Sequence, residues 1–187
     1  MDNRVMVTAI SYVLRTGSPW RDVSARYGLW GSVYGRWRCW CASGLWGQLR
    51  TQVAKQEHGE LRHLDCSHIK LHQHGANPPG GQAQHAIGRT KGGLNTKLSA
   101  VVDAGGRAVA VSLAPGQQHA QHAVAPLLPC LRHHRVVADK GFDGEPFRGR
   151  LRAQHTRCCI PPKRGRRHPA KFHRGQATRP GPLRFRV

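Results

Sequence analysis

A chain of 187 residues, 39 % of them hydrophobic, has room for one ordinary domain, or for a small helical domain with an incomplete larger one. The 30 Lys and Arg against 9 Asp and Glu give a formal net charge of +21, which predicts a polyanionic partner, typically a nucleic acid. No apolar run is long enough to span a membrane, and no apolar leader follows the first residues. The sequence therefore predicts a cytoplasmic protein with reduced thiols and no membrane partner.

The basic charge also has a compositional explanation. Arg outnumbers Lys by 23 to 7, and the planar Arg side chain suits paired hydrogen bonds to phosphate. GC-rich coding enriches Arg, Gly, Pro, Ala and His whatever a protein does. Both explanations stand at this point.

Residues 1–50 are predicted to form a small helical, helix-turn-helix-like DNA-binding region. Apolar residues recur at helical spacing over residues 6–14, and a glycine then offers a stop. A short helix is expected over 20–27, and a longer one begins at Trp30. Short helices joined by glycine-containing turns are typical of helix-turn-helix proteins.

Aromatic and basic residues are concentrated in this helical region. All five tryptophans lie within residues 20–46; a compact core is their expected role, and stacking on bases is the alternative. Four arginines lie off the apolar stripe and are predicted to face DNA phosphates: Arg21, Arg26, Arg36 and Arg38.

A polar linker is expected over residues 51–60, and the apolar period then changes to that of strands. Residues 75–93 are a loop rich in Gly, Pro and Gln. Helices are expected over 121–131 and 144–154, and strands over 61–71, 94–102, 108–113, 135–139 and 157–160. This order predicts an α/β fold with a mixed sheet over residues 61–162.

The pattern changes again near residue 163. The segment 163–187 is rich in basic residues, Pro and Gly and has no apolar period, and no Asp or Glu follows Glu145. Such a segment cannot bury enough apolar surface to order itself, so a basic, disordered tail is expected. Its first cations are predicted to contact DNA: Lys163, Arg164, Arg166 and Arg167.

Two of the acidic residues have an unusual setting. Asp65 and Asp139 each lie within or at the end of an apolar predicted strand, where a carboxylate is costly unless it is paired or binds a metal. On neighbouring strands they could share Mg²⁺ or Mn²⁺, and two such ions activate water and stabilise the leaving oxygen of a phosphodiester. The alternative is that one or both merely cap strand ends.

Several segments resemble the DDE transposases of bacterial insertion sequences, in the group named after insertion sequence five. They occur in the family's order between about residues 10 and 174. The segments are RTGSPWRD at 15–22, YGRWRCW at 34–40, LDCSHIK at 64–70, AIGRTKGGLNTK at 86–97, PGQ at 115–117, VADKGFD at 137–143 and IPPK at 160–163.

The resemblance implies an incomplete RNase H-like core, with Asp65 and Asp139 as metal-binding catalytic carboxylates. It implies cleavage at element ends and attack of the freed 3′-hydroxyl on target DNA. The partners would be the element's terminal inverted repeats and target DNA, with a homodimer as a further expectation. Four cations would hold the DNA backbone: Arg89, Lys91, Lys97 and Lys140.

The sequence departs from the family near its end. In the family, a Tyr…Arg…Glu…Lys signature on a helix follows the second Asp by several dozen residues. Here residues 171–175 resemble the approach to that helix, but Pro180 and Pro182 oppose a helix and no Glu is present. The third carboxylate is therefore missing, which predicts a truncated or frameshifted chain that is inactive alone. An active subunit completed by frameshifting is the alternative, and so is a non-enzymatic DNA-binding remnant or regulator.

Histidine spacing raises a further alternative, a zinc-binding protein. His68, His72 and His74 are close in sequence, as are two other histidine pairs. His68 and His72 lie four apart on a predicted strand, however, and the strand rise places them about 13 Å apart. Because that separation is too large for one zinc ion, the metal-carboxylate hypothesis is preferred.

Overall fold

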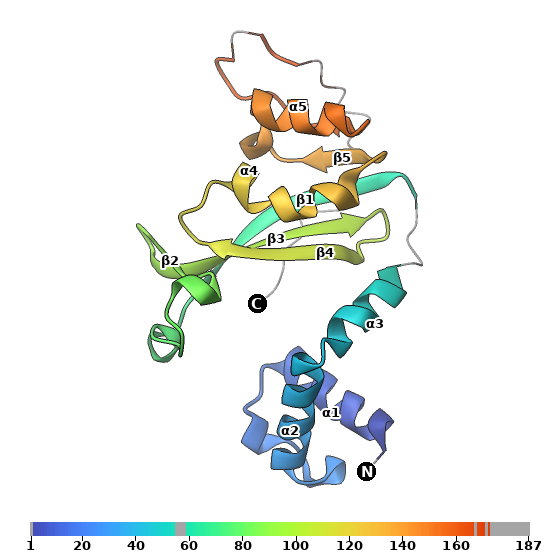
Figure 1. Ribbon diagram of the computed structural model, residues 1–187, viewed down its shortest axis with the longest axis vertical. Helices are drawn as coiled ribbons and strands as arrows, with labels where there is room; N and C mark the ends of the chain where they lie inside the picture. Colours follow the sequence, from blue (N-terminus) through green and yellow to red (C-terminus); the bar gives the residue numbers. More distant parts are fainter. Residues whose placement is uncertain (1, 55–58, 167, 171, 173–187) are drawn as a thin grey trace. The chain divides into compact units, whose positions relative to one another are not determined.

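The computed structural model describes residues 2–54, 59–166, 168–170 and 172 (Figure 1). The chain divides into two compact units, Met1–Lys55 and Gln56–Val187, and each has its own hydrophobic core. No helix in the described ranges is long and apolar enough to cross a membrane.

The first unit is helical. Asp2 caps the first helix by accepting the Arg4 N–H at 3.0 Å, and Gly17 ends it with a positive φ of 69°, a conformation that glycine adopts without strain. The elements are α1 (Asn3–Thr16), η1 (Trp20–Asp22), η2 (Ala25–Tyr27), α2 (Trp30–Ala42) and α3 (Leu45–Ala54).

Two features of this unit differ from the sequence prediction. The helix expected over 20–27 is two single 3-10 turns, because Val23 between them is extended and buried in the core. Helix α3 was not predicted, and it makes residues 51–54 helical where a linker was expected. Residues 55–58 lie outside the described part.

Aliphatic side chains form the centre of the first core, and tryptophans surround them. Ile10 and Val33 are fully buried, and Trp20, Trp37, Trp40 and Trp46 pack against the cluster. The Trp37 ring lies 6.0 Å from Trp20 and 5.2 Å from Trp46, between ring centroids. These contacts confirm the predicted aromatic core for four of the five tryptophans; Trp30 is 41 % exposed.

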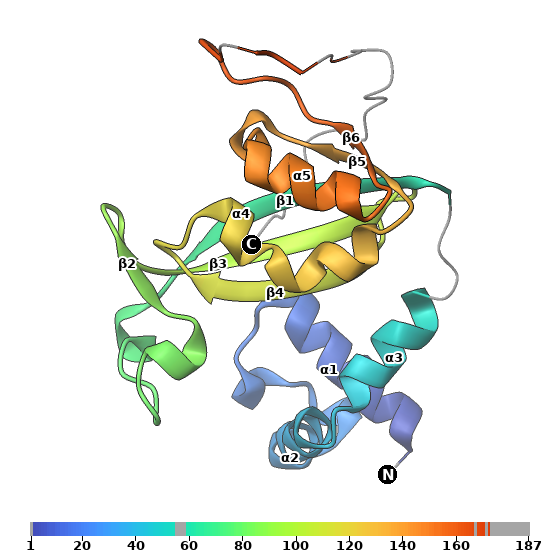
Figure 2. The same ribbon diagram turned by 45° about the horizontal axis from the view of Figure 1, so that its top comes forward.

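The second unit is built on a mixed six-stranded sheet, which confirms the predicted α/β class (Figure 2). The strand order is β2-β3-β1-β5-β6, and β4 pairs with β3. Strand β1 is antiparallel to β3 and parallel to β5. The strands are β1 (Leu61–Lys70), β2 (Gly88–Thr90), β3 (Gly93–Asp103), β4 (Ala108–Pro115), β5 (Arg135–Ala138) and β6 (Arg157–Cys159).

Short helices connect these strands. The helix expected over 121–131 is one α-helical turn followed by a 3-10 segment, since Pro126 and Pro129 remove the N–H donors that an α-helix needs. The elements are η3 (Gln73–Gly75), η4 (Ala83–His85), α4 (Ala120–Ala123), η5 (Ala125–Leu131), η6 (Lys140–Phe142) and α5 (Glu145–Ala153).

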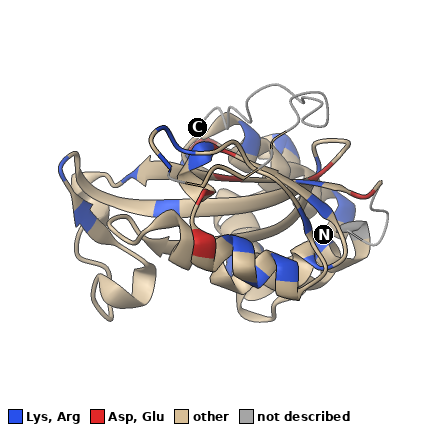
Figure 3. Ribbon diagram, turned by 90° about the horizontal axis from the view of Figure 1, so that it is seen from above, with Lys and Arg blue, Asp and Glu red and all other residues tan. Residues whose placement is uncertain are grey.

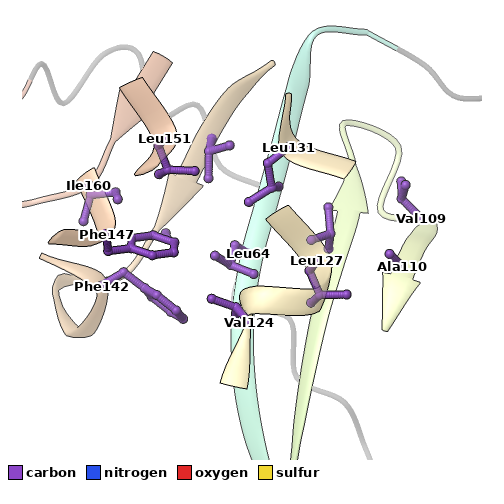
Figure 4. Close-up of a cluster of buried hydrophobic side chains, with 13 residues drawn as sticks. Leu64, Val109, Ala110, Val124, Leu127, Leu131, Phe142, Phe147, Leu151 and Ile160 are labelled. Carbon is purple, nitrogen blue, oxygen red and sulfur yellow. The ribbon is translucent and has the colours of Figure 1, made fainter. Parts of the chain in front are cut away.

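The core of this unit lies between one face of the sheet and the helices (Figure 4). Leu64 on β1 and Val136 on β5 meet Leu127, Phe147 and Leu151 from η5 and α5. Successive side chains of a strand point to opposite faces. Asp65, next to Leu64, therefore points away from this core.

Candidate metal centre

The sheet register brings the two predicted carboxylates together. Leu64 of β1 pairs with Ala138 of β5 in a parallel ladder, so the next residues, Asp65 and Asp139, lie side by side where β5 ends. The two carboxylates also interact electrostatically, because the negative charge of Asp139 contributes to raising the pKa of Asp65. Paired aspartates at this edge are the arrangement that the sequence predicted.

Backbone amides orient each carboxylate. Asp65 Oδ1 accepts the Cys66 N–H at 2.7 Å, and Asp139 Oδ1 accepts the Gly141 N–H at 2.7 Å, which makes Asp139 the N-cap of η6. A Cβ atom at Gly141 would lie 2.8 Å from Asp139 Oδ1. A side chain at position 141 would therefore collide with the Asp139 carboxylate, and glycine avoids that collision.

The site favours a bound cation. Burial raises the pKa of Asp65 most, the Cys66 N–H opposes that rise, and the charge of Asp139 adds to it. A divalent ion would relieve both the burial cost and the repulsion, and Mg²⁺ commonly takes one or two protein carboxylates. Burial also raises the pKa of the adjacent Cys66 thiol, which lies 3.1 Å from Ser99 Oγ and stays protonated. The donor set is therefore two oxygen ligands, which fits Mg²⁺ or Mn²⁺.

The raised pKa of Asp65 has a consequence for stability. Its charged form is disfavoured in the folded state, so Asp65→Asn is expected to raise the free energy of unfolding at pH 7 by about 0.5–2 kcal/mol. The gain shrinks as the pH falls through the pKa of Asp65, because the wild-type carboxyl then becomes neutral too. Thermal unfolding in chelator at pH 7 and pH 4 measures both effects.

The exposed Asp22 offers the matched control for this substitution. Asp22→Asn should change the unfolding free energy by no more than about 0.5 kcal/mol at either pH. A lower melting temperature for Asp65→Asn than for wild type at pH 7 would contradict the assigned burial cost.

No third acid joins the pair among the described residues. Asp103 accepts the Arg107 backbone N–H at 2.9 Å and its Nε at 3.1 Å. Asp143 and Glu145 are engaged by arginines. The described ranges contain no group of three or more His, Cys, Asp or Glu side chains that could hold a metal ion. The histidines therefore give the zinc alternative no structural support within these ranges.

The predicted DNA-contacting arginines of the first unit are exposed. Three of them lie over aromatic rings, which holds each guanidinium at the surface. The pairs are Arg21 over Trp30 at 5.4 Å, Arg26 over Tyr27 at 4.5 Å and Arg36 over Trp40 at 5.9 Å. Their contact with DNA, and that of Arg38, stays a prediction.

The predicted cations of the second unit fall into two groups. Figure 3 marks Lys and Arg in blue at many positions along the ribbon. The exposed members of the predicted set are Arg89, Lys91, Lys140, Lys163 and Arg164. Lys97 differs, because the residue is only 7 % exposed and its Nζ donates to the Gln118 carbonyl. Arg166 is ion-paired with Asp143 and Glu145. Arg167 lies outside the described residues, as does most of the predicted tail.

The sheet and its paired aspartates define the class, an RNase H-like α/β protein of the DDE type. Residues 58–184 match the family model described as "Transposase DDE domain", and residues 1–50 match "Putative transposase of IS4/5 family". The chain belongs to the transposase DDE domain family, which confirms the predicted resemblance. Transposases of this family bind DNA and generally use a divalent metal.

One curated relative is similar over part of the chain. It is "Uncharacterized protein y4sN" of Sinorhizobium fredii, 28 % identical over 75 residues that make up 40 % of this chain. The match spans 60 % of the length of that relative. No solved structure matches this chain.

Proposed function

We propose that this chain binds the terminal inverted repeats of an insertion element and its target DNA, and that Asp65 and Asp139 hold Mg²⁺ or Mn²⁺ for strand cleavage and transfer. The observation that carries the proposal is the pairing of Leu64 with Ala138, which sets the two carboxylates side by side. The net charge of +21 supports the DNA partner.

The residues around the site have distinct roles in this proposal. The Cys66 and Gly141 N–H groups each bind one oxygen of the neighbouring carboxylate, which leaves the second oxygen to face a cation. When bound, the ions would activate water and stabilise the leaving oxygen of a phosphodiester. The half-buried setting of Asp65 strengthens its attraction for positive charge because less water competes there.

We further propose that the chain does not complete this chemistry alone. Two aspartates supply two negative charges, whereas two divalent ions carry four positive charges, and the described residues add no third acid. A two-ion site that lacks one ligand loses both charge and geometry. The chain would then bind DNA without cleaving or joining it.

A second copy of this chain is the protein partner that we propose, because joining both ends of an element to one target requires two sites. Sedimentation with and without an end-sequence duplex tests the dimer. A single chain per complex at saturating DNA would exclude it.

The central experiment combines a binding assay with a cleavage assay. The purified chain is titrated onto a labelled duplex carrying the element end and onto a scrambled duplex, at salt concentrations from 50 to 200 mM. We expect tighter binding to the end sequence and a linear fall of log K with log salt. With Mg²⁺ or Mn²⁺ we expect no nicked or joined product.

Two outcomes would overturn parts of the proposal. Equal, salt-independent affinity for both duplexes would remove the DNA-binding role. Robust cleavage that disappears in Asp139→Asn would show that the chain is catalytically complete.

A further inference from the structure

A basic pocket lies on the sheet, apart from the pair of carboxylates. It is a surface pocket of about 440 Å³ between the end of β1 and the hairpin of β2 and β3. Its lining includes two lysines and a histidine and contains no carboxylate. The lining residues are His68, Lys70, Thr90, Lys91, Gly92 and Asn95.

The strand pattern gathers these side chains. His68 and Lys70 lie two apart on β1, so they share one face, and Lys70 pairs with Asn95 of β3. The hairpin turns tightly after Thr90, which pairs with Gly93, and Gly93 has a positive φ of 98°. Lys70 was not among the cations predicted to contact DNA, although its spacing of two from His68 on a strand indicates that both face one side.

Asn95 fixes the wall of the pocket. Its side chain is buried, with the residue only 4 % exposed. Its Nδ2 donates to Thr90 Oγ1 at 2.5 Å and to the Gly93 carbonyl at 3.1 Å. Since that carbonyl can only accept, the amide oxygen faces His68 Nδ1, at 3.0 Å, and the ring nitrogen donates. The wall is therefore held in place before any ligand arrives.

The two lysines carry the charge of the pocket. Lys70 and Lys91 are exposed, and neither forms an ion pair with any described carboxylate. Two ammonium groups that open onto one cavity repel each other, and an anion would offset that repulsion. Lysine recognises phosphate as a point charge, with its three N–H donors free to reorient.

The pocket is separate from the metal centre but lies on the same strand. Strand alternation puts Asp65 on the face opposite His68 and Lys70, and three residues of strand span about 10 Å. Strand β5 pairs with β1 only as far as Leu64, so among the described residues this edge of β1 has no strand partner beyond Leu64. A DNA strand that follows this open edge advances about 3.4 Å per nucleotide, so about three nucleotides cover the 10 Å.

We propose that this pocket binds a backbone phosphate of the DNA a few nucleotides from the bond held at Asp65 and Asp139. The proposal rests on the DNA-binding function proposed above, and it adds a second contact between the chain and the DNA strand held at Asp65 and Asp139. Because phosphate contacts position DNA without reading its sequence, the pocket sets the register of the strand at the metal centre.

The test uses the full chain with Lys70→Ala, Lys91→Ala and the double variant, titrated onto the end-sequence duplex at several salt concentrations. We expect each single variant to lower the salt slope by about 1, and the double variant to lose on the order of tenfold in affinity at 100 mM salt. Lys70→Arg/Lys91→Arg keeps both charges and should retain most of the affinity. Melting temperatures confirm that every variant is folded.

Arg150→Ala is the matched control, because Arg150 is an exposed cation on α5 outside the pocket. If the wild type binds with a steep salt slope and the lysine variants behave like Arg150→Ala, the pocket is not a phosphate site, while the proposed DNA binding survives. If the wild type shows no salt-dependent binding, the proposed function fails and the pocket fails with it.

Discussion

Asp139→Asn is expected to lower the affinity of the chain for Mn²⁺ by at least about tenfold, the smallest loss usual when a group that supports a metal site is removed. Asp65 alone then faces the cation, and an Asn oxygen carries no net charge. Calorimetric titration of Mn²⁺ into the wild type and the variant measures the loss without requiring catalysis. Asp65→Asn should weaken binding to a similar degree.

The pH dependence of metal binding gives a second readout. A carboxylate must be deprotonated to hold the ion, and the pKa of Asp65 is raised by burial and by Asp139. Mn²⁺ affinity should therefore begin to fall at a higher pH than it would for an aspartate of ordinary pKa. Asp22→Asn, at an exposed position in the other unit, should leave the whole curve unchanged.

The two aspartates also link stability to function. Asp65→Asn is expected to stabilise the metal-free fold while it weakens metal binding, a trade-off that is common where a site requires an unfavourable charge. Undiminished Mn²⁺ affinity in both Asp65→Asn and Asp139→Asn would support the alternative interpretation of the sequence, in which the two carboxylates merely cap strand ends.

The strands that carry the two aspartates were predictable because their signals are local. The predicted strand over residues 61–71 and the one ending at Asp139 appear as β1 and β5, since apolar residues around each aspartate leave few other structures. The parallel pairing of β1 with β5 was not determined by either segment alone. The family resemblance implied that Asp65 and Asp139 bind metal together, and the parallel ladder places them side by side.

Two cations that were predicted to contact DNA are engaged by residues far away in the sequence. The family resemblance placed Lys97 among the cations that hold the DNA backbone, but its Nζ donates to the carbonyl of Gln118, 21 residues away. Arg166 is engaged by Asp143 across 23 residues. Charge patterning reports that a cation is present, but its burial depends on the tertiary fold.

Asp143 is expected to be the most stabilising acid of the second unit. It is buried, its Oδ1 accepts Arg148 Nε at 2.7 Å, and its Oδ2 accepts the Lys163 N–H at 2.7 Å. Asp143→Ala leaves the buried Arg148 guanidinium without its counter-charge, which typically costs about 3–5 kcal/mol. Chemical denaturation of the wild type and the variant measures this loss.

The matched control is the exposed acid two residues later. Glu145 and its partner Arg152 have side chains 58 % and 61 % exposed, so Glu145→Ala should cost far less stability than Asp143→Ala. Asp143→Ala/Arg148→Met removes both buried charges and should recover part of the loss. Equal costs for Asp143→Ala and Glu145→Ala would show that burial does not strengthen the pair.

The contribution of Asp143 depends on pH in a defined direction. Burial alone would raise the pKa of Asp143, but the Lys163 N–H and the Arg148 and Arg166 guanidinium groups outweigh it and lower the pKa. The stabilisation is therefore full above the unfolded-state pKa of about 3.9 and is lost as the pH falls through the lower folded-state value. The difference between wild type and Asp143→Ala should narrow over that acid range.

Asp143 also connects this ion-pair network to the proposed metal centre. It follows η6, a three-residue turn whose N-cap is Asp139, so the network holds the far end of the turn that orients the Asp139 carboxylate. Asp143→Ala should therefore lower Mn²⁺ affinity as well as stability, even under conditions in which the variant is fully folded. Glu145→Ala should leave Mn²⁺ affinity unchanged, because Glu145 lies beyond the turn and Asp143 keeps its Arg148 and Lys163 partners without it. Wild-type affinity in a folded Asp143→Ala variant would restrict the network to a structural role.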